Sequence, residues 1–187
     1  MSIQNTPRAS RLHIGLFGNR NAGKSSLINA LTGQSISLVS PFAGTTTDPV
    51  YKSFELHGVG PVVFIDTAGL DDEGELGQLR VEKTKEALDK TDLALMVLTA
   101  HPEKELPWLD ILKEKGVPTL VVLNQCDPLE QPDALANELR ESLALPVLAV
   151  SAATGENIPA LRQELVRLVP EDFWDLTITG DRVTEGD

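Results

Sequence analysis

The sequence predicts a three-layer α/β fold whose six-stranded sheet is mostly parallel, with one antiparallel edge strand. Short segments with strand character alternate with segments of helical periodicity along the chain. Four of the strand segments are apolar on both sides, which is typical of strands buried in a parallel sheet. One alternates apolar and polar residues, as a strand at a sheet edge does. Together these observations favour helices on both faces of the sheet.

The expected elements follow from this patterning. The alternating segment is VYKSFEL at 50–56, so we expect the edge strand there. Polar clusters follow the strand segments, and α/β folds bind ligands at the carboxyl ends of their strands. The expected strands are 11–18, 50–56, 62–66, 93–100, 119–124 and 146–152, and the expected helices are 24–32, 79–89, 106–115, 133–143 and 158–168.

Length and composition indicate one domain with short extensions. The chain has 187 residues, of which 41% are hydrophobic and 24% charged, which is enough apolar material for a core. We expect an N-terminal extension at 1–10, the folded domain at 11–170, and a linker or the start of a truncated following domain at 171–187.

Composition also argues against several classes of protein. No apolar run is long enough to span a membrane, and the start has no apolar core of signal-peptide type, so we expect a cytoplasmic protein. Cys126 is the single cysteine, which excludes a disulfide framework. The net charge of −12 makes a nucleic-acid partner unexpected, because such proteins concentrate positive charge.

A phosphate-binding loop is predicted between the first strand and the first helix. Residues 18–25 read GNRNAGKS and fit the pattern GxxxxGKS. The glycines let the backbone wrap a phosphate, and the following helix adds the positive end of its dipole. We expect Lys24 to reach the β- and γ-phosphates and Ser25 to ligate Mg²⁺. The nucleotide-contacting residues expected in this segment are Gly18, Asn19, Arg20, Asn21, Ala22, Gly23, Lys24, Ser25 and Ser26.

A second polar cluster, DTAG at 66–69, ends the third strand. Asp66 is placed to hold a Mg²⁺-bound water, and the amide of Gly69 is placed to sense the γ-phosphate. Because the cluster lies at a second strand end, we expect it beside the phosphate loop.

Two further clusters are suited to reading a base. NQCD at 124–127 follows the fifth strand, and the Asp127 carboxylate can accept hydrogen bonds from N1–H and the amino group of guanine. Adenine lacks these donors, and an unpaired buried carboxylate is costly, so such a site rejects it. SAA at 151–153 follows the last strand, where the Ala152 amide can bond guanine O6. The expected base-contacting residues are Asn124, Gln125, Asp127, Ser151, Ala152 and Ala153.

In this order and spacing, the clusters resemble the translation-factor class of small GTPases over residues 11–168. The resemblance implies the P-loop NTPase, Ras-like GTPase fold, with GTP or GDP and Mg²⁺ as ligands. The segment GTTTD at 44–48 resembles switch I of GTPases of the MnmE and Era type. By that resemblance Thr46 ligates Mg²⁺, and Thr45 also contacts the nucleotide site.

The catalytic group expected from the same resemblance involves potassium. Leu70 stands where Ras-like proteins carry a water-orienting glutamine, so hydrolysis should be slow without further help. Asn21 resembles the K⁺ ligand of MnmE-like GTPases, with backbone carbonyls of Ser40, Phe42 and Thr45 completing the cage. The alternative for Asn21 is a turn residue, and Arg20 is either an internal arginine finger or directed to solvent. The expected catalytic residues are Lys24, Asn21, Thr46 and Gly69.

Several strings resemble one family more specifically, the GTPase domain of the FeFe-hydrogenase maturation factor HydF. These strings include TDPVY at 47–51 and DDEGEL at 71–76, while Gln125 replaces the lysine of the usual NKxD. The resemblance implies a GTP-hydrolysing switch that gates assembly or transfer of the hydrogenase cluster precursor. It implies contacts with the other domains of the factor, with other maturation proteins and the hydrogenase, and a GTP-dependent dimer of G domains.

No iron–sulfur cluster is expected in this chain, because one cysteine in a base-binding loop and three scattered histidines do not form a ligand set. The alternative function is an Era- or MnmE-like GTPase acting in tRNA modification or ribosome assembly. A third alternative is a nucleotide-binding interaction module whose hydrolysis is incidental.

Overall fold

The computed structural model describes residues 11–19, 21–33, 49–67, 74–125, 130–171 and 173. Their strands are β1 (Leu12–Gly18), β2 (Val50–Leu56), β3 (Gly60–Asp66), β4 (Leu93–Leu98), β5 (Thr119–Leu123) and β6 (Val147–Ala149). Their helices are α1 (Lys24–Thr32), α2 (Gly74–Asp89), α3 (Leu106–Glu114), α4 (Pro132–Leu143) and α5 (Ile158–Leu168).

The six strands form one sheet in the order β2-β3-β1-β4-β5-β6. Only β2 is antiparallel to its neighbour, and it lies at the edge, as its alternating sequence predicts. All other pairs are parallel. The predicted fold class is therefore confirmed.

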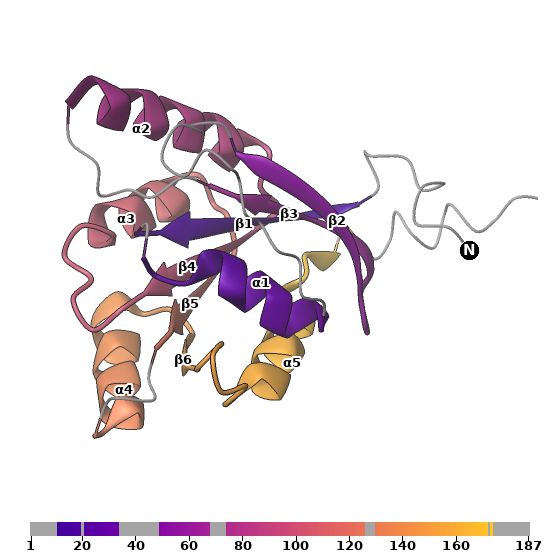
Figure 1. Ribbon diagram of the computed structural model, residues 1–187, viewed down its shortest axis with the longest axis vertical. Coiled ribbons are helices and arrows are strands. Elements are labelled where there is room, and N and C mark those ends of the chain that lie inside the picture. The colour runs from indigo at the N-terminus through magenta and orange to yellow at the C-terminus, as the bar shows by residue number, and fades with distance from the viewer. Residues whose placement is uncertain are drawn as a thin grey trace, which may run out of the picture.

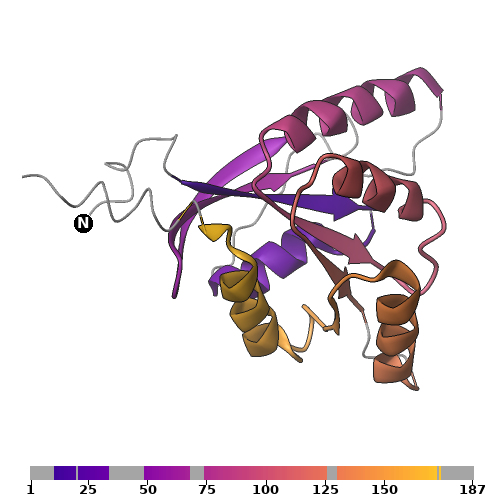
Figure 2. The same ribbon diagram turned by 180° about the vertical axis from the view of Figure 1, so that it is seen from behind.

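Helices cover both faces of the sheet (Figures 1 and 2). On one face, apolar residues of α1 and α5, among them Leu27, Ile28 and Leu161, join a core with the inward residues of β1, β3 and β4. On the other face, α2, α3 and α4 contribute Leu88, Trp108 and Ala136 to a second core. Strands apolar on both sides are thus explained by burial on both sides.

Two element boundaries differ clearly from expectation. Helix α2 begins at Gly74 rather than at 79, because glycines at 74 and 77 lower the helix propensity of a segment that is nevertheless helical. Strand β6 covers only Val147–Ala149, since Ser151 turns away and forms an isolated bridge to Glu156 instead. Within the described residues, no helix is both long and apolar enough to cross a bilayer.

The parallel arrangement brings the carboxyl ends of β1, β3, β5 and β6 to one edge of the sheet. The segments that follow these strands contain the phosphate loop, Asp66, Asn124 and Ser151. The fold therefore collects the predicted site residues of the described chain in one region.

Candidate nucleotide-binding site

The phosphate loop requires glycine at both of its ends. Gly18 has φ 147°, and a Cβ there would lie 2.3 Å from the carbonyl oxygen of Val97 on β4. Gly23 has φ 85°, and a Cβ there would lie 2.5 Å from Nδ2 of Asn124. Any side chain would thus push the loop away from the sheet and from the base-side loop. The two glycines let the chain turn tightly into α1, whose N-terminus faces the site.

Lys24 is buried, at 6% exposure, although it carries a charge. Its Nζ donates hydrogen bonds to the carbonyl oxygens of Gly18, at 2.9 Å, and Asn19, at 2.6 Å. These bonds fold the side chain back over the loop, where a phosphate would lie. The phosphate-binding role of Lys24 stays a prediction, for which these contacts place the side chain at the loop.

Ser25 and Asp66 meet although they are 41 residues apart in sequence. The Ser25 hydroxyl donates a hydrogen bond to Oδ2 of Asp66 at 2.9 Å, which joins the start of α1 to the end of β3. Both groups are partly buried and carry oxygen atoms, the ligands that Mg²⁺ prefers. The residues present therefore fit a Mg²⁺ ion bound by Ser25 and, directly or through water, by Asp66; such an ion would neutralise phosphate charge.

Thr67, which the sequence analysis left without a role, secures the start of the DTAG segment. Its buried hydroxyl donates a 2.6 Å hydrogen bond to the carbonyl oxygen of Leu16 on β1. This bond holds the end of β3 against the strand that leads into the phosphate loop. The sequence signal for this structural role of Thr67 is a threonine directly after a buried strand.

Asn124 connects the phosphate loop with the last loop of the site, and its expected contact with the nucleotide stays a prediction. Its Nδ2 donates to the carbonyl oxygen of Ala22 at 2.8 Å, and its Oδ1 accepts from the amide of Ala152 at 3.1 Å. Both ends of the amide are therefore engaged by protein. The Ala152 amide, expected to bond guanine O6, donates to Asn124 in this structure.

Gln125 makes a second link between the same loops. It has φ 58°, and its Nε2 donates to the carbonyl oxygen of Asn21 at 2.8 Å. The neutral glutamine thus contacts the phosphate-loop backbone, and its expected contact with the nucleotide stays a prediction. The side chain of Asn21 lies on an exposed part of the loop.

Ser151 forms hydrogen bonds within its own loop. It is fully buried, and its Oγ accepts from the amide of Thr154 at 3.2 Å, while its amide donates to the carbonyl oxygen of Glu156 at 3.1 Å. These bonds close the loop that presents Ala152 and the exposed Ala153. Ser151 thus has a structural role in this loop, and its expected contact with the base stays a prediction.

Lys52 on β2 is a functional candidate that sequence reasoning missed. It is 9% exposed, and its Nζ is buried with no hydrogen-bond partner among the described residues. Burial lowers the pKa of its ammonium group, and the charge of Asp66 partly opposes this effect. In register, Lys52 pairs with Phe64, two residues before Asp66, so an unpaired cation lies beside the expected Mg²⁺ site.

Several expected site residues lie outside the described residues. These are Arg20 in the phosphate loop, Ser40, Phe42, Thr45 and Thr46 in the expected switch I, Gly69 and Leu70 after Asp66, and Cys126 and Asp127 after Gln125. Ser26, also expected at the nucleotide, is exposed in the first turn of α1. The described half of the site consists of the phosphate loop, the Ser25–Asp66 pair and the Asn124 link.

Comparisons with known proteins agree with this arrangement. The family model for 50S ribosome-binding GTPases matches residues 13–125. GTPase Der of Wolinella succinogenes is 35% identical over 179 residues, which cover 88% of this chain and 37% of Der. The tRNA modification GTPase MnmE of Burkholderia thailandensis is 36% identical over 164 residues, which cover 84% of this chain and 34% of MnmE.

Solved structures are similar in fold. Era bound to MgGDPNP and a segment of 16S ribosomal RNA has a TM-score of 0.73 at 28% identity, covering 85% of this chain and 57% of Era. The NFeoB protein of S. thermophilus bound to GDP·AlF4⁻ and K⁺ has a TM-score of 0.63 at 25% identity, covering 84% of this chain and 62% of NFeoB.

The chain spans little more than a third of the length of its relatives Der and MnmE. The matched family model covers more than half of the chain, and it includes the phosphate loop, Asp66 and Asn124. With its six-stranded sheet and P-loop, the chain belongs to the 50S ribosome-binding GTPase family of P-loop GTPases.

Proposed function

We propose that residues 11–170 form a switch domain that binds GTP with Mg²⁺ and hydrolyses it slowly. The observation that supports this proposal best is the meeting of Ser25 with Asp66 at 2.9 Å, directly beside the buried Lys24. Phosphate charge and a metal ion would both be held there by groups that the fold already places. The Asp127 carboxylate supplies the choice of guanine over adenine.

The test compares hydrolysis of GTP and ATP by the wild type and two variants. Lys24→Ala should abolish turnover, because the phosphate charge loses its counter-ion. Asp127→Ala should bring the GTP and ATP affinities to within about tenfold of each other, because guanine N1–H and the amino group lose their acceptor. Unchanged preference for GTP in Asp127→Ala would refute the base-reading role, and normal turnover in Lys24→Ala would refute the phosphate-loop role.

For catalysis we propose that K⁺ supplies the charge that the missing glutamine and an arginine finger do not. Asn21 and the backbone carbonyls of Ser40, Phe42 and Thr45 would bind the ion. The resemblance to a K⁺-bound NFeoB and to MnmE supports this idea. A cation beside the phosphates stabilises the charge that develops during transfer. Thr46 would hold Mg²⁺, and the Gly69 amide would contact the γ-phosphate.

The K⁺ test is a comparison of GTP hydrolysis in KCl and NaCl at equal ionic strength. We expect faster hydrolysis in KCl, since Na⁺ is smaller and would span the ligand cage poorly. Asn21→Ala should remove the difference while GDP affinity is retained. Equal rates in the two salts would refute the K⁺ mechanism.

Two cellular roles remain as proposals for the whole protein. The names of the relatives favour the first, an Era- or MnmE-like role in tRNA modification or ribosome assembly. The second is a role in FeFe-hydrogenase maturation, with the other domains of the factor, the maturation proteins and the hydrogenase as partners. The strings at 47–51 and 71–76 and the net charge of −12 support this second role.

Genetic complementation with the full-length parent separates the two roles. In a host with an FeFe-hydrogenase, deletion of the gene should abolish hydrogenase activity under the second role and leave tRNA modification and ribosome profiles normal. Under the first role the pattern is reversed. A Lys24→Ala version that restores either phenotype as well as the wild type would show that GTP turnover is not needed for that role.

A further inference from the structure

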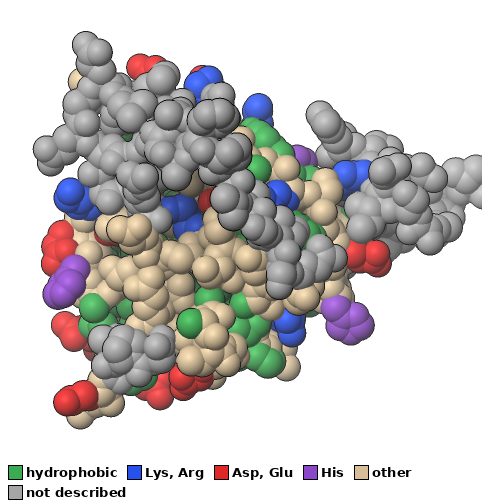
Figure 3. Space-filling view, viewed as in Figure 1, with side chains coloured by type: hydrophobic (Ala, Val, Ile, Leu, Met, Phe, Trp, Pro, Cys, Tyr) green, Lys and Arg blue, Asp and Glu red, His purple; other side chains and the backbone are tan. Residues whose placement is uncertain are grey.

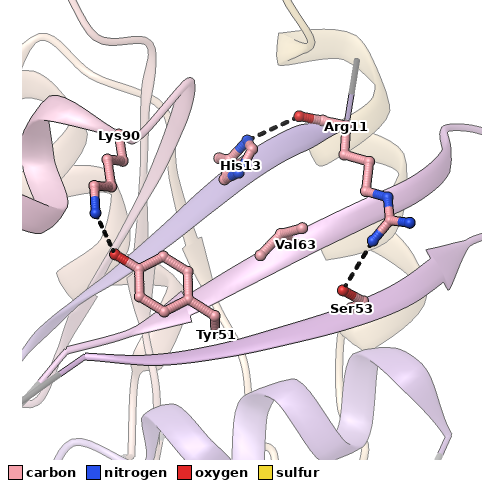
Figure 4. Close-up of a pocket in the computed structure, with 6 residues that line it drawn as sticks. All are labelled: Arg11, His13, Tyr51, Ser53, Val63 and Lys90. Carbon is pink, nitrogen blue, oxygen red and sulfur yellow. Dashed lines mark hydrogen bonds between the residues drawn. The ribbon is translucent and has the colours of Figure 1, made fainter. Parts of the chain in front are cut away.

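A cavity of about 430 Å³ lies away from the nucleotide site, on the face of the sheet that carries α2 (Figure 4). It is lined by Arg11, His13, Tyr51, Ser53, Val63 and Lys90. Three residues that lie side by side on neighbouring strands form its floor. Ser53 on β2 pairs with Val63 on β3, and Val63 pairs with His13 on β1. The cavity has the size of a small-molecule site.

The walls of this cavity carry positive charge on two sides. At one end, the Arg11 guanidinium donates to the hydroxyl of Ser53 at 3.2 Å. At the other end, the Lys90 Nζ lies 3.4 Å from the Tyr51 hydroxyl and 5.5 Å from the centre of its ring. Figure 4 shows these two pairs on opposite sides of Val63. A ligand between them would therefore meet a cation at each end.

The remaining lining groups also present hydrogen-bond donors. When the Ser53 and Tyr51 oxygens accept from Arg11 and Lys90, their own hydroxyl protons are left to donate elsewhere. The Nδ1 proton of His13 is used by the carbonyl oxygen of Arg11 at 2.8 Å, so Nε2 is its second polar atom. Four of the six lining side chains, those of Arg11, Tyr51, Ser53 and Lys90, thus offer a donor to the cavity, and none of the six is acidic.

The carboxylate of Asp92, which follows α2, contacts the backbone and ring of His13. Oδ2 of Asp92 accepts from the amide of His13 at 2.9 Å and lies 3.5 Å from Nδ1 of the same residue, and Asp92 does not line the cavity. A basic, donor-rich cavity stands out in a chain with a net charge of −12. It matches a ligand that is negatively charged and rich in acceptors.

We propose that this cavity is a second ligand site, which binds a small molecule carrying a phosphate monoester. The phosphate oxygens would accept from Lys90 and from the hydroxyl proton of Tyr51 at one end, and polar oxygens of the organic part would accept from Arg11 and Ser53 at the other. The cavity is larger than a lone phosphate requires, so the organic part of the ligand would pack against Val63 and the exposed Tyr51 ring. This proposal does not depend on the GTPase reaction.

The test uses amide NMR shifts of the full chain, with GDP and Mg²⁺ present in excess so that the phosphate loop is occupied. Glucose 6-phosphate and inorganic phosphate are titrated, and neutral glucose serves as the uncharged control. We expect saturable shifts at Tyr51, Ser53 and His13 with the two phosphate probes and none with glucose, while the Gly23 amide stays constant.

Two lysine variants on α2 or just after it make the test specific. Lys90→Ala should weaken glucose 6-phosphate binding about tenfold, the loss of one charge-assisted hydrogen bond. Lys85→Ala removes an equal charge from the exposed side of α2, outside the cavity, and should bind like the wild type. The proposal is overturned if neither phosphate probe gives saturable shifts in the cavity, or if Lys90→Ala and Lys85→Ala bind equally well.

Discussion

At the scale of single residues, the site is held together by side chains that hydrogen-bond to neighbouring loops. Asn124 is the clearest case, because its one amide joins the phosphate loop at Ala22 to the last loop at Ala152. Its side chain is buried, and so is its partner Ala22, while Ala152 is partly buried. The position of the phosphate loop therefore depends on a residue more than a hundred positions away.

Asn124→Ala should lower the free energy of unfolding by about 2 kcal/mol, since it leaves a buried carbonyl and a partly buried amide without partners. Urea denaturation without nucleotide measures this effect. Asn137→Ala is the matched control, because Asn137 is exposed on α4 and contacts only Arg140 in the described structure. A loss of stability as small as that of the control would contradict the linking role of Asn124.

Lys52, unlike Asn124, should destabilise the folded protein. A buried ammonium without a hydrogen-bond partner is unfavourable, and Met fills a similar volume without charge. Lys52→Met should therefore raise the free energy of unfolding at pH 7 by about 1 kcal/mol. Lys85→Met, on an exposed position, should leave it nearly unchanged.

The same residue gives a pH dependence whose sign follows from burial. The pKa of Lys52 is lowered in the folded protein from its ordinary value of 10.5. At pH values between the lowered pKa of the folded protein and 10.5, the unfolded chain binds more protons than the folded protein does. The free energy of unfolding therefore rises with pH in this range. The advantage of Lys52→Met over the wild type should therefore shrink from pH 7 to pH 10, as denaturation at both values will show. A constant advantage would contradict it.

At the scale of elements, one side chain of α5 forms hydrogen bonds with the C-terminal end of α1. Nε and Nη2 of Arg162 donate to the carbonyl oxygens of Leu31, at 3.1 Å, and Ala30, at 3.0 Å, in the last turn of α1. These carbonyls have no partner within their own helix, so the guanidinium acts as a cap. The helix that begins at the phosphate loop is thus anchored at its other end.

Arg162→Ala should lower the free energy of unfolding by about 1–2 kcal/mol through loss of this cap. Arg167→Ala is the control on the same helix, because Arg167 is 76% exposed and pairs only with Glu164 three residues earlier. Thermal or urea denaturation of both variants measures the difference. Equal stabilities would show that the cap contributes nothing.

At the scale of the whole molecule, the negative net charge bears on whether the domain can bind nucleic acid. The net charge is −12, and the view in Figure 3 shows basic side chains as separate groups rather than a continuous surface over the described residues. Affinity for nucleic acid without base contacts depends on releasing counter-ions with clustered Lys and Arg. We therefore expect the domain by itself to bind RNA weakly.

The chain should bind a single-stranded RNA with a dissociation constant weaker than about 10⁻⁴ M at physiological salt, the weak end of non-specific binding. Fluorescence anisotropy with a labelled RNA of about 20 nucleotides, with GDP or a non-hydrolysable GTP analogue, measures this constant. A dissociation constant in the micromolar range would instead support a direct RNA contact by this domain and favour the ribosome- or tRNA-directed role.

The sequence by itself determined the fold class and the chemistry of the phosphate loop. Both depend on local rules: alternation marks β2 as the edge strand, apolar runs mark the buried strands, and GNRNAGKS leaves little choice of backbone path around a phosphate. The helix bounds of α1 and α5 were predicted correctly for the same reason. Glycines 74 and 77 misled the prediction of α2, because helix propensity is a weak influence beside tertiary packing.

Only the tertiary structure decided what the polar residues at the strand ends contact. The partners of Asn124 are Ala22 and Ala152, on loops that come near it only after the sheet has formed. The burial of Lys52, whose Nζ has no hydrogen-bond partner in the described part of the chain, and the cavity between Arg11 and Lys90 likewise depend on elements far apart in sequence. Sequence periodicity reports which face of an element is buried, whereas hydrogen-bond partners and cavities depend on distances between elements, which no local pattern encodes.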